Sequence, residues 1–393
     1  MVKKIIFLMS FNDINLHLNS WKDLYSEFDK TFKNVFFVNS DYLKIINLKS
    51  KKFSKKKIKD LKNFKIFNPK SIKEFHDFIN NDKVLIISNL SKGFNDYLIN
   101  LYLNKKNISQ LVIANRGNLQ ASVYYFMKYN LRFIYELIVY FFPRKLTPFL
   151  YEIGIFKKID VRFDSNRKII NAFYKNKKRG FFKKPSIYQN MILSNSRNLE
   201  SLKIKEKKSS KKIILFLDME PDYRQMKWTP ISIENIKSHY NKINLLLDKI
   251  QKTQKKKVVV SIHPLANFNK AKNYLKNFEI TKFKTQELIT RSDLILFFDT
   301  SAIVDALYLK KKIICLRSKI FYGKKYNSDL YKDILKLKSI NIEDDLKKNI
   351  TKIKKIIRFK KVNYDKYLTT YAGFNSFKSG EKQIISYIKK NYF

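Results

Sequence analysis

Short apolar runs rich in β-branched residues recur along this chain, and stretches with helical periodicity separate them. In the first half the runs cover residues 4–10, 34–40, 83–89 and 110–117. Strands that alternate with helices predict a parallel sheet covered by helices on both faces. The runs are apolar throughout instead of alternating with polar residues, which is typical of strands buried on both sides. The sequence therefore predicts an α/β fold.

The same pattern starts again after a polar, charged segment. Residues 196–212 (SRNLESLKIKEKKSSKK) have the composition of a linker. Further runs follow at 212–222, 256–264, 293–309 and 311–319. We therefore expect two Rossmann-like lobes with parallel sheets and an interdomain cleft, an N-terminal lobe over 1–200 and a C-terminal lobe over 211–393. The last helix could cross back to the first lobe.

The net charge is +49, from 82 Lys and Arg against 33 Asp and Glu. Such a surface attracts nucleic acid, anionic membranes and anionic substrates. The basic residues are mostly Lys, however, and they are spread over nearly every segment beside many Asn, Ile, Tyr and Phe, as an AT-rich coding sequence would produce. No motif concentrates Arg and aromatic residues, so we expect no specific nucleic-acid partner.

Cysteine, histidine and glycine usage excludes several classes of protein. The single cysteine, Cys315, excludes an internal disulfide and fits a reducing compartment. The four histidines show no metal-ligand spacing, so no metal site is expected. The seven glycines form neither a GxGxxG nor a Walker A motif, which disfavours dinucleotide oxidoreductases and P-loop NTPases. We therefore expect no bound cofactor.

The longest apolar region, residues 131–156, bears on the localisation. Its uncharged run Leu137–Pro143 is far shorter than the roughly 20 residues that span a bilayer. Aromatic and basic residues alternate in it, as in a segment that lies at an anionic membrane surface, but a buried helix pair fits equally well. The lysines and short apolar run of the N-terminus lack a cleavage site and indicate a strand, not a signal peptide. We expect a cytoplasmic protein with peripheral contact to the plasma membrane.

Two polar groups follow apolar runs of the second half, where ligands of a parallel sheet bind. His263 and Pro264 end the run at 257–262. An imidazole N–H is a good donor to phosphate oxygens, and the proline would turn the chain so that the ring points outward. The alternative is a surface histidine next to a loop proline.

The second polar group is Asp299, Thr300 and Ser301, which lies between an apolar run and a helical pattern. Thr300 or Ser301 is a natural N-cap, and a helix N-terminus with hydroxyl groups binds phosphate without glycines. A plain N-cap is the alternative. Because we expect the two strand ends to be adjacent, we predict that His263 and this helix start together hold a monophosphate or diphosphate.

The stretches VVVSIHPLANF (258–268) and KTQELITRSDLILFFDTSAIVDALYLKKKIICL (284–316) resemble the donor-binding lobe of a known family. The family is the bacterial surface-carbohydrate glycosyltransferases of GT-B architecture, with His-Pro-motif polysialyltransferases, sialyltransferases and the glycerophosphotransferases of teichoic-acid synthesis. The resemblance covers roughly residues 212–320. It implies inverting, metal-independent transfer of a nucleotide-activated sugar, such as a CMP-linked acidic sugar, to a capsule or lipopolysaccharide glycan.

The resemblance also implies roles for single residues. His263, Ser301 and Thr300 would contact the donor phosphate, and the acceptor would be a glycan or a lipid-linked glycan. Thr285 is either a helix N-cap or a nucleotide contact.

The chain departs from the family at the catalytic base. Related sialyltransferases carry two carboxylates and a glycine at a strand end of the N-terminal lobe, where this chain has Asn115, Arg116 and Gly117. Gly117 fits the turn. Arg116 stays protonated and cannot act as a base, but it could grip a carboxylate or phosphate.

Three other carboxylates are candidates for the base that the inverting transfer needs: Asp13, Asp218 and Glu220. Each could instead be a solvated loop carboxylate. Other enzymatic functions remain open, namely glycerophosphate transfer and nucleotide-sugar epimerisation. A catalytically inactive carbohydrate- or RNA-binding protein is the alternative from another class.

Overall fold

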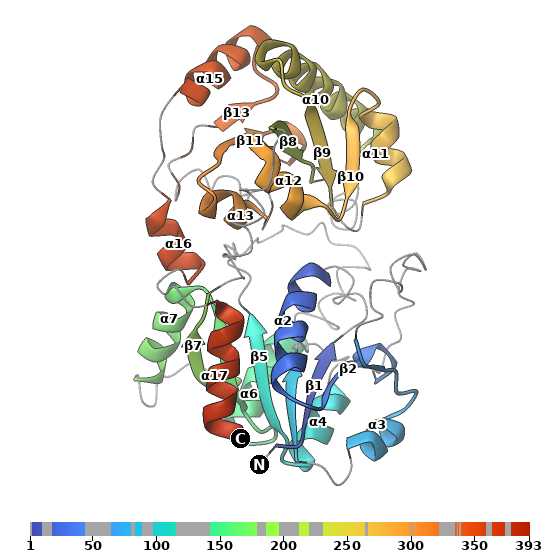
Figure 1. Ribbon diagram of the computed structural model, residues 1–393, viewed down its shortest axis with the longest axis vertical. Helices are drawn as coiled ribbons and strands as arrows, with labels where there is room; N and C mark the ends of the chain where they lie inside the picture. Colours follow the sequence, from blue (N-terminus) through green and yellow to red (C-terminus); the bar gives the residue numbers. More distant parts are fainter. Residues whose placement is uncertain are drawn as a thin grey trace. The chain divides into compact units, whose positions relative to one another are not determined.

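The computed structural model describes most of the chain. The described residues are 2–9, 18–43, 64–79, 83–88, 97–114, 142–178, 186–195, 212–219, 231–263, 266–298, 300, 302–321, 335, 337, 339–358, 364–373 and 379–393. They form two compact units, one with the described residues up to Asn195 and those from Gly373 to the C-terminus, the other with those from Lys212 to Ala372. Each unit is an α/β domain built on one parallel sheet (Figure 1), as the sequence predicts.

The first unit contains a seven-stranded sheet in the order β3-β2-β1-β4-β5-β6-β7. Its strands are β1 Lys4–Met9, β2 Val35–Asn39, β3 Ile66–Phe67, β4 Val84–Ser88, β5 Ser109–Ala114, β6 Ile159–Asp164 and β7 Tyr188–Leu193. Its helices are α2 Leu18–Thr31, α3 Ile72–Ile79, α4 Tyr97–Lys105, α6 Phe142–Glu152, α7 Arg167–Lys177 and α17 Gly380–Tyr392, with a 3-10 turn at Ser40–Leu43. The four predicted strands of this half are confirmed, and β3, β6 and β7 are added to them.

Strand β1 shows why these runs are apolar throughout. Phe7 packs in a cluster with residues of α2 and α17 on one face of the sheet. Leu8 packs on the other face with residues of α3 and α4. Because helices cover both faces, successive side chains of the strand are all removed from water.

The last helix, α17, belongs to the first unit. Ile384 and Ile388 lie in the same apolar cluster as Phe7, and the Asn195 N–H donates to Gln383 Oε1 at 3.2 Å. The lobe bounds predicted from the sequence ran to residue 393, and α17 was also expected to be able to cross back to the first lobe; the structure places it in the first unit. The reason is that α17 buries its isoleucines against that sheet.

The second unit contains a six-stranded parallel sheet in the order β10-β9-β8-β11-β12-β13. Its strands are β8 Ile213–Leu217, β9 Val258–Ile262, β10 Glu279–Lys282, β11 Ser292–Phe297, β12 Lys312–Arg317 and β13 Ser339–Asn341. Its helices are α10 Ile233–Gln254, α11 Phe268–Tyr274, α12 Thr285–Arg291, α13 Ile303–Tyr308, α15 Leu346–Arg358 and α16 Asp365–Tyr371, with a 3-10 turn at Lys319–Phe321. The four predicted strands of this half (β8, β9, β11 and β12) are confirmed, and all of them share one sheet.

Of the long apolar region 131–156, the structure describes residues 142–156, which include helix α6. Its Tyr151 packs with Phe156 and Ile159 against the first sheet. Across the described ranges, no helix combines the length and apolar character needed to cross a bilayer.

Candidate functional site

The carboxyl ends of β9, β8 and β11 lie side by side in the second sheet. His263 follows β9, Asp218 follows β8, and Thr300 comes shortly after β11. Strand order reverses between β8 and β11, because the chain continues outward from β8 through β9 and from β11 through β12. Such a switch point is where open α/β sheets bind ligands.

The strand order corrects one expectation. We predicted that the strand ends carrying His263 and Thr300 are adjacent, but β8 lies between β9 and β11. Two strand spacings put those ends about 10 Å apart. A ligand that contacts both residues therefore passes across the end of β8, where Asp218 is located.

Asp218 is buried and tightly held. Its Oδ2 accepts a hydrogen bond from the Tyr240 hydroxyl at 2.9 Å, and its backbone N–H donates to the Ser261 carbonyl at 3.0 Å. Tyr240 in turn stacks on Tyr274, with ring centroids 4.6 Å apart. The solvated-loop interpretation of Asp218 is therefore wrong. Of the other base candidates, Asp13 and Glu220 lie outside the described residues.

Thr285 has a different role from the helix cap that the sequence allowed. It is the first residue of α12, while Lys284 occupies the N-cap without a side-chain bond to the helix. The Thr285 Oγ1 lies 2.8 Å from Ser261 Oγ, so this pair of hydroxyls ties the start of α12 to β9. Ser261 is buried and was missed by sequence reasoning, although it is the one polar residue of the run VVVSI.

His263 lies at the turn that follows β9. Its side chain is partly exposed, and its carbonyl accepts the Ala266 N–H at 2.9 Å. Lys282, at the end of β10, donates from Nζ to the Ala266 carbonyl at 2.7 Å and so places a cation beside this turn. Sequence reasoning missed Lys282, because lysines are too frequent in this chain to mark a site. Pro264 lies outside the described residues.

Thr300 closes the turn that enters α13. Its Oγ1 accepts the Ala302 N–H at 3.2 Å, and its carbonyl accepts the Ile303 N–H at 3.5 Å. The helix begins at Ile303, two residues later than a start at Ser301. Ala302 is the N-cap of α13 and has no side-chain cap bond, so the N-cap predicted at Thr300 or Ser301 is wrong; the Thr300 hydroxyl instead stabilises the turn before the helix. Asp299 and Ser301 lie outside the described residues.

Three further polar side chains, His239, Ser318 and Glu343, are linked by hydrogen bonds at the ends of β12 and β13. His239 Nδ1 and Ser318 Oγ are 2.9 Å apart, and Ser318 Oγ donates to Glu343 Oε1 at 3.0 Å. Burial lowers the pKa of His239 to about 3, with a smaller contribution from the charge of Lys242, so its imidazole is neutral at physiological pH. Ser318 donates a hydrogen bond to the Glu343 carboxylate and accepts one from the His239 N–H. His239 therefore cannot act as the base that would activate Ser318. These hydrogen bonds join α10 to the ends of β12 and β13 and have a structural role.

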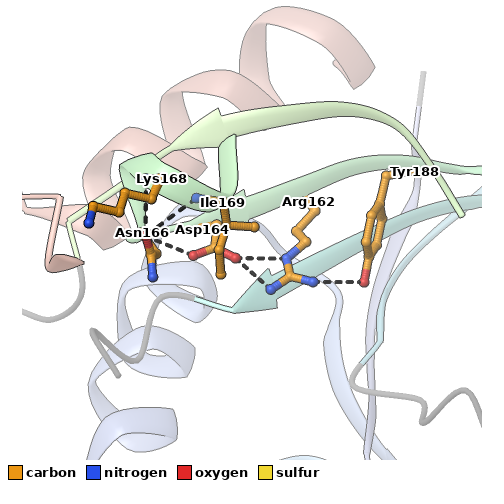
Figure 2. Close-up of polar contacts among 6 residues, drawn as sticks. All are labelled: Arg162, Asp164, Asn166, Lys168, Ile169 and Tyr188. Carbon is orange, nitrogen blue, oxygen red and sulfur yellow. Dashed lines mark hydrogen bonds and ion pairs between the residues drawn. The ribbon is translucent and has the colours of Figure 1, made fainter. Parts of the chain in front are cut away.

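In the first unit, a polar cluster forms at the carboxyl end of β6 (Figure 2). Arg162 donates from Nε and Nη2 to Asp164 Oδ2 at 2.9 and 2.5 Å, and from Nη1 to the Tyr188 hydroxyl at 3.2 Å. Asp164 Oδ1 accepts the Asn166 N–H at 2.8 Å, and the Asn166 side chain caps α7. Burial raises the pKa of Asp164, and Arg162 opposes that shift.

Sequence reasoning missed this cluster, although the string FDSN at the end of β6 resembles the string FDTS that follows β11. The arginine that it selected instead, Arg116, lies outside the described residues together with Gly117. Within the described residues, no group of three or more His, Cys, Asp or Glu side chains could hold a metal ion.

No family model and no curated protein sequence matches the chain. Solved structures do match over its whole length. A putative UDP-N-acetylglucosamine 2-epimerase from Listeria monocytogenes has a TM-score of 0.57 at 11% identity, with 100% of this chain and 97% of that chain covered. The UDP-GlcNAc 2-epimerase from Neisseria meningitidis, bound to UDP-GlcNAc, has a TM-score of 0.55 at 14% identity, with 99% and 100% covered.

The H548A variant of the wall teichoic acid polymerase TagF has a TM-score of 0.51 at 15% identity, with 99% of this chain and 89% of that chain covered. At these identities the similarity concerns the fold. The chain has a GT-B-like fold of two Rossmann-like α/β domains.

Proposed function

We propose that this protein is a glycosyltransferase that moves a sugar from a nucleotide-activated donor to a cell-surface glycan, with inversion and without a metal ion. In the reaction an acceptor hydroxyl would attack the anomeric carbon, the bond from that carbon to the donor phosphate would break, and a carboxylate would take the hydroxyl proton. The second unit would bind the donor.

One observation carries the proposal. His263, Asp218 and Thr300 follow three neighbouring parallel strands at the point where strand order reverses. The cation of Lys282 beside the His263 turn adds attraction for an anion. Because β8 separates the two phosphate-binding candidates by about 10 Å, a diphosphate or a phosphate with its sugar fits this edge better than a lone phosphate.

The structural neighbours support a nucleotide-sugar ligand. The structure of the Neisseria epimerase contains UDP-GlcNAc, and that of the MnaA protein of S. aureus contains UDP. MnaA matches with a TM-score of 0.54 at 12% identity, with 99% of this chain and 96% of that chain covered. The sequence resemblance instead favours a CMP-linked acidic sugar, with glycerophosphate transfer as an alternative. The identity of the nucleotide therefore has to be measured.

Titration of the protein with UDP, CMP and CDP, followed by calorimetry, tests the donor site. His263→Ala should remove a charge-assisted hydrogen bond of roughly 1.5–3 kcal/mol and weaken binding about ten- to a hundredfold. Ser301→Ala should weaken binding less, because a serine hydroxyl is a neutral donor. His76→Ala, at a partly exposed histidine of α3, is the matched control. Unchanged affinity in His263→Ala, or no nucleotide binding by the intact protein, would contradict the proposal.

The role of Asp218 needs a separate measurement. Asp218→Asn keeps the shape of the side chain and an acceptor for the Tyr240 hydroxyl, but it removes a base. If Asp218 is the base, turnover should fall by about a hundredfold or more while nucleotide affinity stays within about twofold. Tyr240→Phe removes the hydrogen bond and keeps the carboxylate, so it separates positioning of Asp218 from proton transfer.

Nucleotide-sugar epimerisation is the second candidate function, because epimerases are among the structural neighbours above a TM-score of 0.5. The two functions differ in their need for an acceptor. An epimerase converts UDP-GlcNAc alone, whereas a transferase releases nucleotide only slowly until a glycan acceptor is added. Nucleotide binding without turnover under either condition would favour an inactive binding protein, and salt-sensitive binding to mixed RNA would favour an RNA-binding one.

A further inference from the structure

Helix α6 and the turn after it carry a concentrated group of exposed apolar side chains. Four residues form this group, which we call the α6 patch: Leu146, Phe149, Ile153 and Ile155, with exposed fractions of 43%, 51%, 53% and 45%. Nine large apolar side chains are exposed among the described residues, and four of them fall within the ten positions 146–155. Single exposed apolar residues are ordinary, but a contiguous group marks an interaction surface.

The patch is a second apolar face of a helix whose first apolar face is already buried. Tyr151 and the partly buried Leu150 pack under the sheet with Ile159. Leu146, Phe149 and Ile153, which directly follows α6, are spaced three and four residues apart and so share the side of the helix that faces away from Tyr151. The fold of the first unit therefore does not account for these three side chains.

Lysines border the patch at a fixed position. The Asn104 side chain donates to the Ile155 carbonyl at 2.7 Å and accepts the Lys157 N–H, which joins the end of α4 to the turn after α6. Lys105 and Lys106, at this end of α4, are both exposed. The Lys157 Nζ is 3.5 Å from the Asn107 carbonyl and lies on the same junction.

The one acidic residue of α6 does not offset these cations. Glu152 is paired with Lys158, whose Nζ is 2.7 Å from Glu152 Oε2. The border of the patch is therefore cationic, in a chain with a net charge of +49. An exposed apolar helix face with a lysine border is the arrangement with which helices lie in the interface of an anionic bilayer.

From this charge complementarity we propose that the α6 patch docks the first unit on an anionic lipid surface. The apolar side chains enter the boundary between headgroups and acyl chains, and Lys105 and Lys106 contact anionic headgroups. A surface glycan that grows on a lipid anchor would then be presented at the same membrane, which is the only part of the inference that rests on the proposed function. The binding itself needs no nucleotide, so its test is independent of transfer.

Co-sedimentation of the full chain with lipid vesicles tests the proposal. The protein should bind vesicles of phosphatidylcholine mixed with phosphatidylglycerol, bind pure phosphatidylcholine vesicles much more weakly, and be released by high salt. The double variant Phe149→Ser, Ile153→Ser should lower the partition coefficient about tenfold or more. Lys105→Glu with Lys106→Glu should have a similar effect.

A matched control is offered by α10 in the other unit, where Leu245 is 61% exposed. Leu245→Ser should leave vesicle binding unchanged. In addition, the fluorescence of Phe149→Trp should be quenched by lipids brominated in the acyl chain, and that of Leu245→Trp should not. Melting temperatures of all variants should equal that of the wild type, since each substitution is at an exposed position.

Three results would overturn the proposal. The first is wild-type binding by the Phe149→Ser, Ile153→Ser variant, and the second is no preference for anionic over neutral vesicles. The third is self-association of the wild type, without vesicle binding, that the same double variant abolishes. That third result would make the patch an interface between two copies of this chain.

Discussion

Arg162 directs two of its N–H groups to a single oxygen of Asp164, at 2.9 Å from Nε and 2.5 Å from Nη2. The arginine side chain is only 15% exposed and the aspartate side chain 3% exposed. Removal of one member of a buried pair leaves the other charge without compensation. Loss of one partner should therefore lower the free energy of unfolding by more than the intact pair adds to it.

Asp164→Asn should lower the free energy of unfolding of the first unit by about 3–5 kcal/mol. The exposed pair of Lys65 and Asp29, at 3.5 Å, provides the control, and Asp29→Asn should cost less than about 1 kcal/mol. The fluorescence of Trp21, which is buried in the first unit, reports urea unfolding in a Trp228→Phe background. Equal unfolding midpoints for the two variants would contradict this prediction.

Gly373 should be essential for docking of the C-terminal helix, because two effects coincide there. Its φ of +68° disfavours any L side chain, and a Cβ would lie 2.2 Å from the Ser194 carbonyl oxygen, which is backbone and cannot move aside easily. Gly154 has a φ of +83° but no atom within 4 Å of an added Cβ. Gly154→Ala should therefore cost only about 1–2 kcal/mol, the cost of the left-handed conformation.

Gly373→Ala should cost clearly more than Gly154→Ala, and it should increase amide hydrogen exchange in α17. The measurement is exchange followed by mass spectrometry of peptides from the C-terminal segment. The strain interpretation fails if both alanine variants show the same exchange in α17.

Glu381 should destabilise the first unit at neutral pH. Burial raises the pKa of its carboxyl, and the charges of Asp23 and Glu27 add to this shift. The folded state then binds a proton that the unfolded state has already released, so stability decreases as pH rises from the unfolded pKa towards the folded one. Glu381→Gln carries no charge and should unfold at a higher urea concentration than the wild type at pH 7. A lower midpoint would mean that the ionised carboxylate is stabilising.

Most strands could be predicted from the sequence because helices cover both faces of each sheet and the runs are apolar throughout. Strand β6 (IDVRFD) was missed because charged residues interrupt its apolar pattern, and two of them, Arg162 and Asp164, pair with each other instead of facing water. Strand β7 (YQNMIL) was missed because it lies at the sheet edge and keeps Gln189 and Asn190 exposed.

The candidate site could be predicted only in part. His263 and Thr300 follow strands, as local chemistry indicates. The position of β8 between those strands could not be predicted, since the choice of neighbouring strands depends on contacts distant in sequence. The Ser261 and Thr285 hydroxyl pair was missed for the same reason, because it joins a strand to a helix that begins 24 residues later.

His239 should make the second unit sensitive to acid. Burial lowers the pKa of its imidazole to about 3 in the folded protein, whereas an unfolded histidine has a pKa of about 6.5. Between these values the unfolded state binds more protons than the folded state, so stability falls as pH falls. The slope should approach about 1.4 kcal/mol per pH unit between pH 6 and pH 4.

His239→Gln does not titrate in this range but can still donate to Ser318, so its stability should depend less on pH by about this slope. Ser318→Ala keeps the histidine and removes its partner, so it should lower stability while the pH dependence stays. Cys315, the only cysteine and buried in β12, reports unfolding of the second unit when it becomes reactive towards dithiodipyridine, a thiol reagent active in acid. Identical pH slopes for the wild type and His239→Gln would show that another group causes the acid sensitivity.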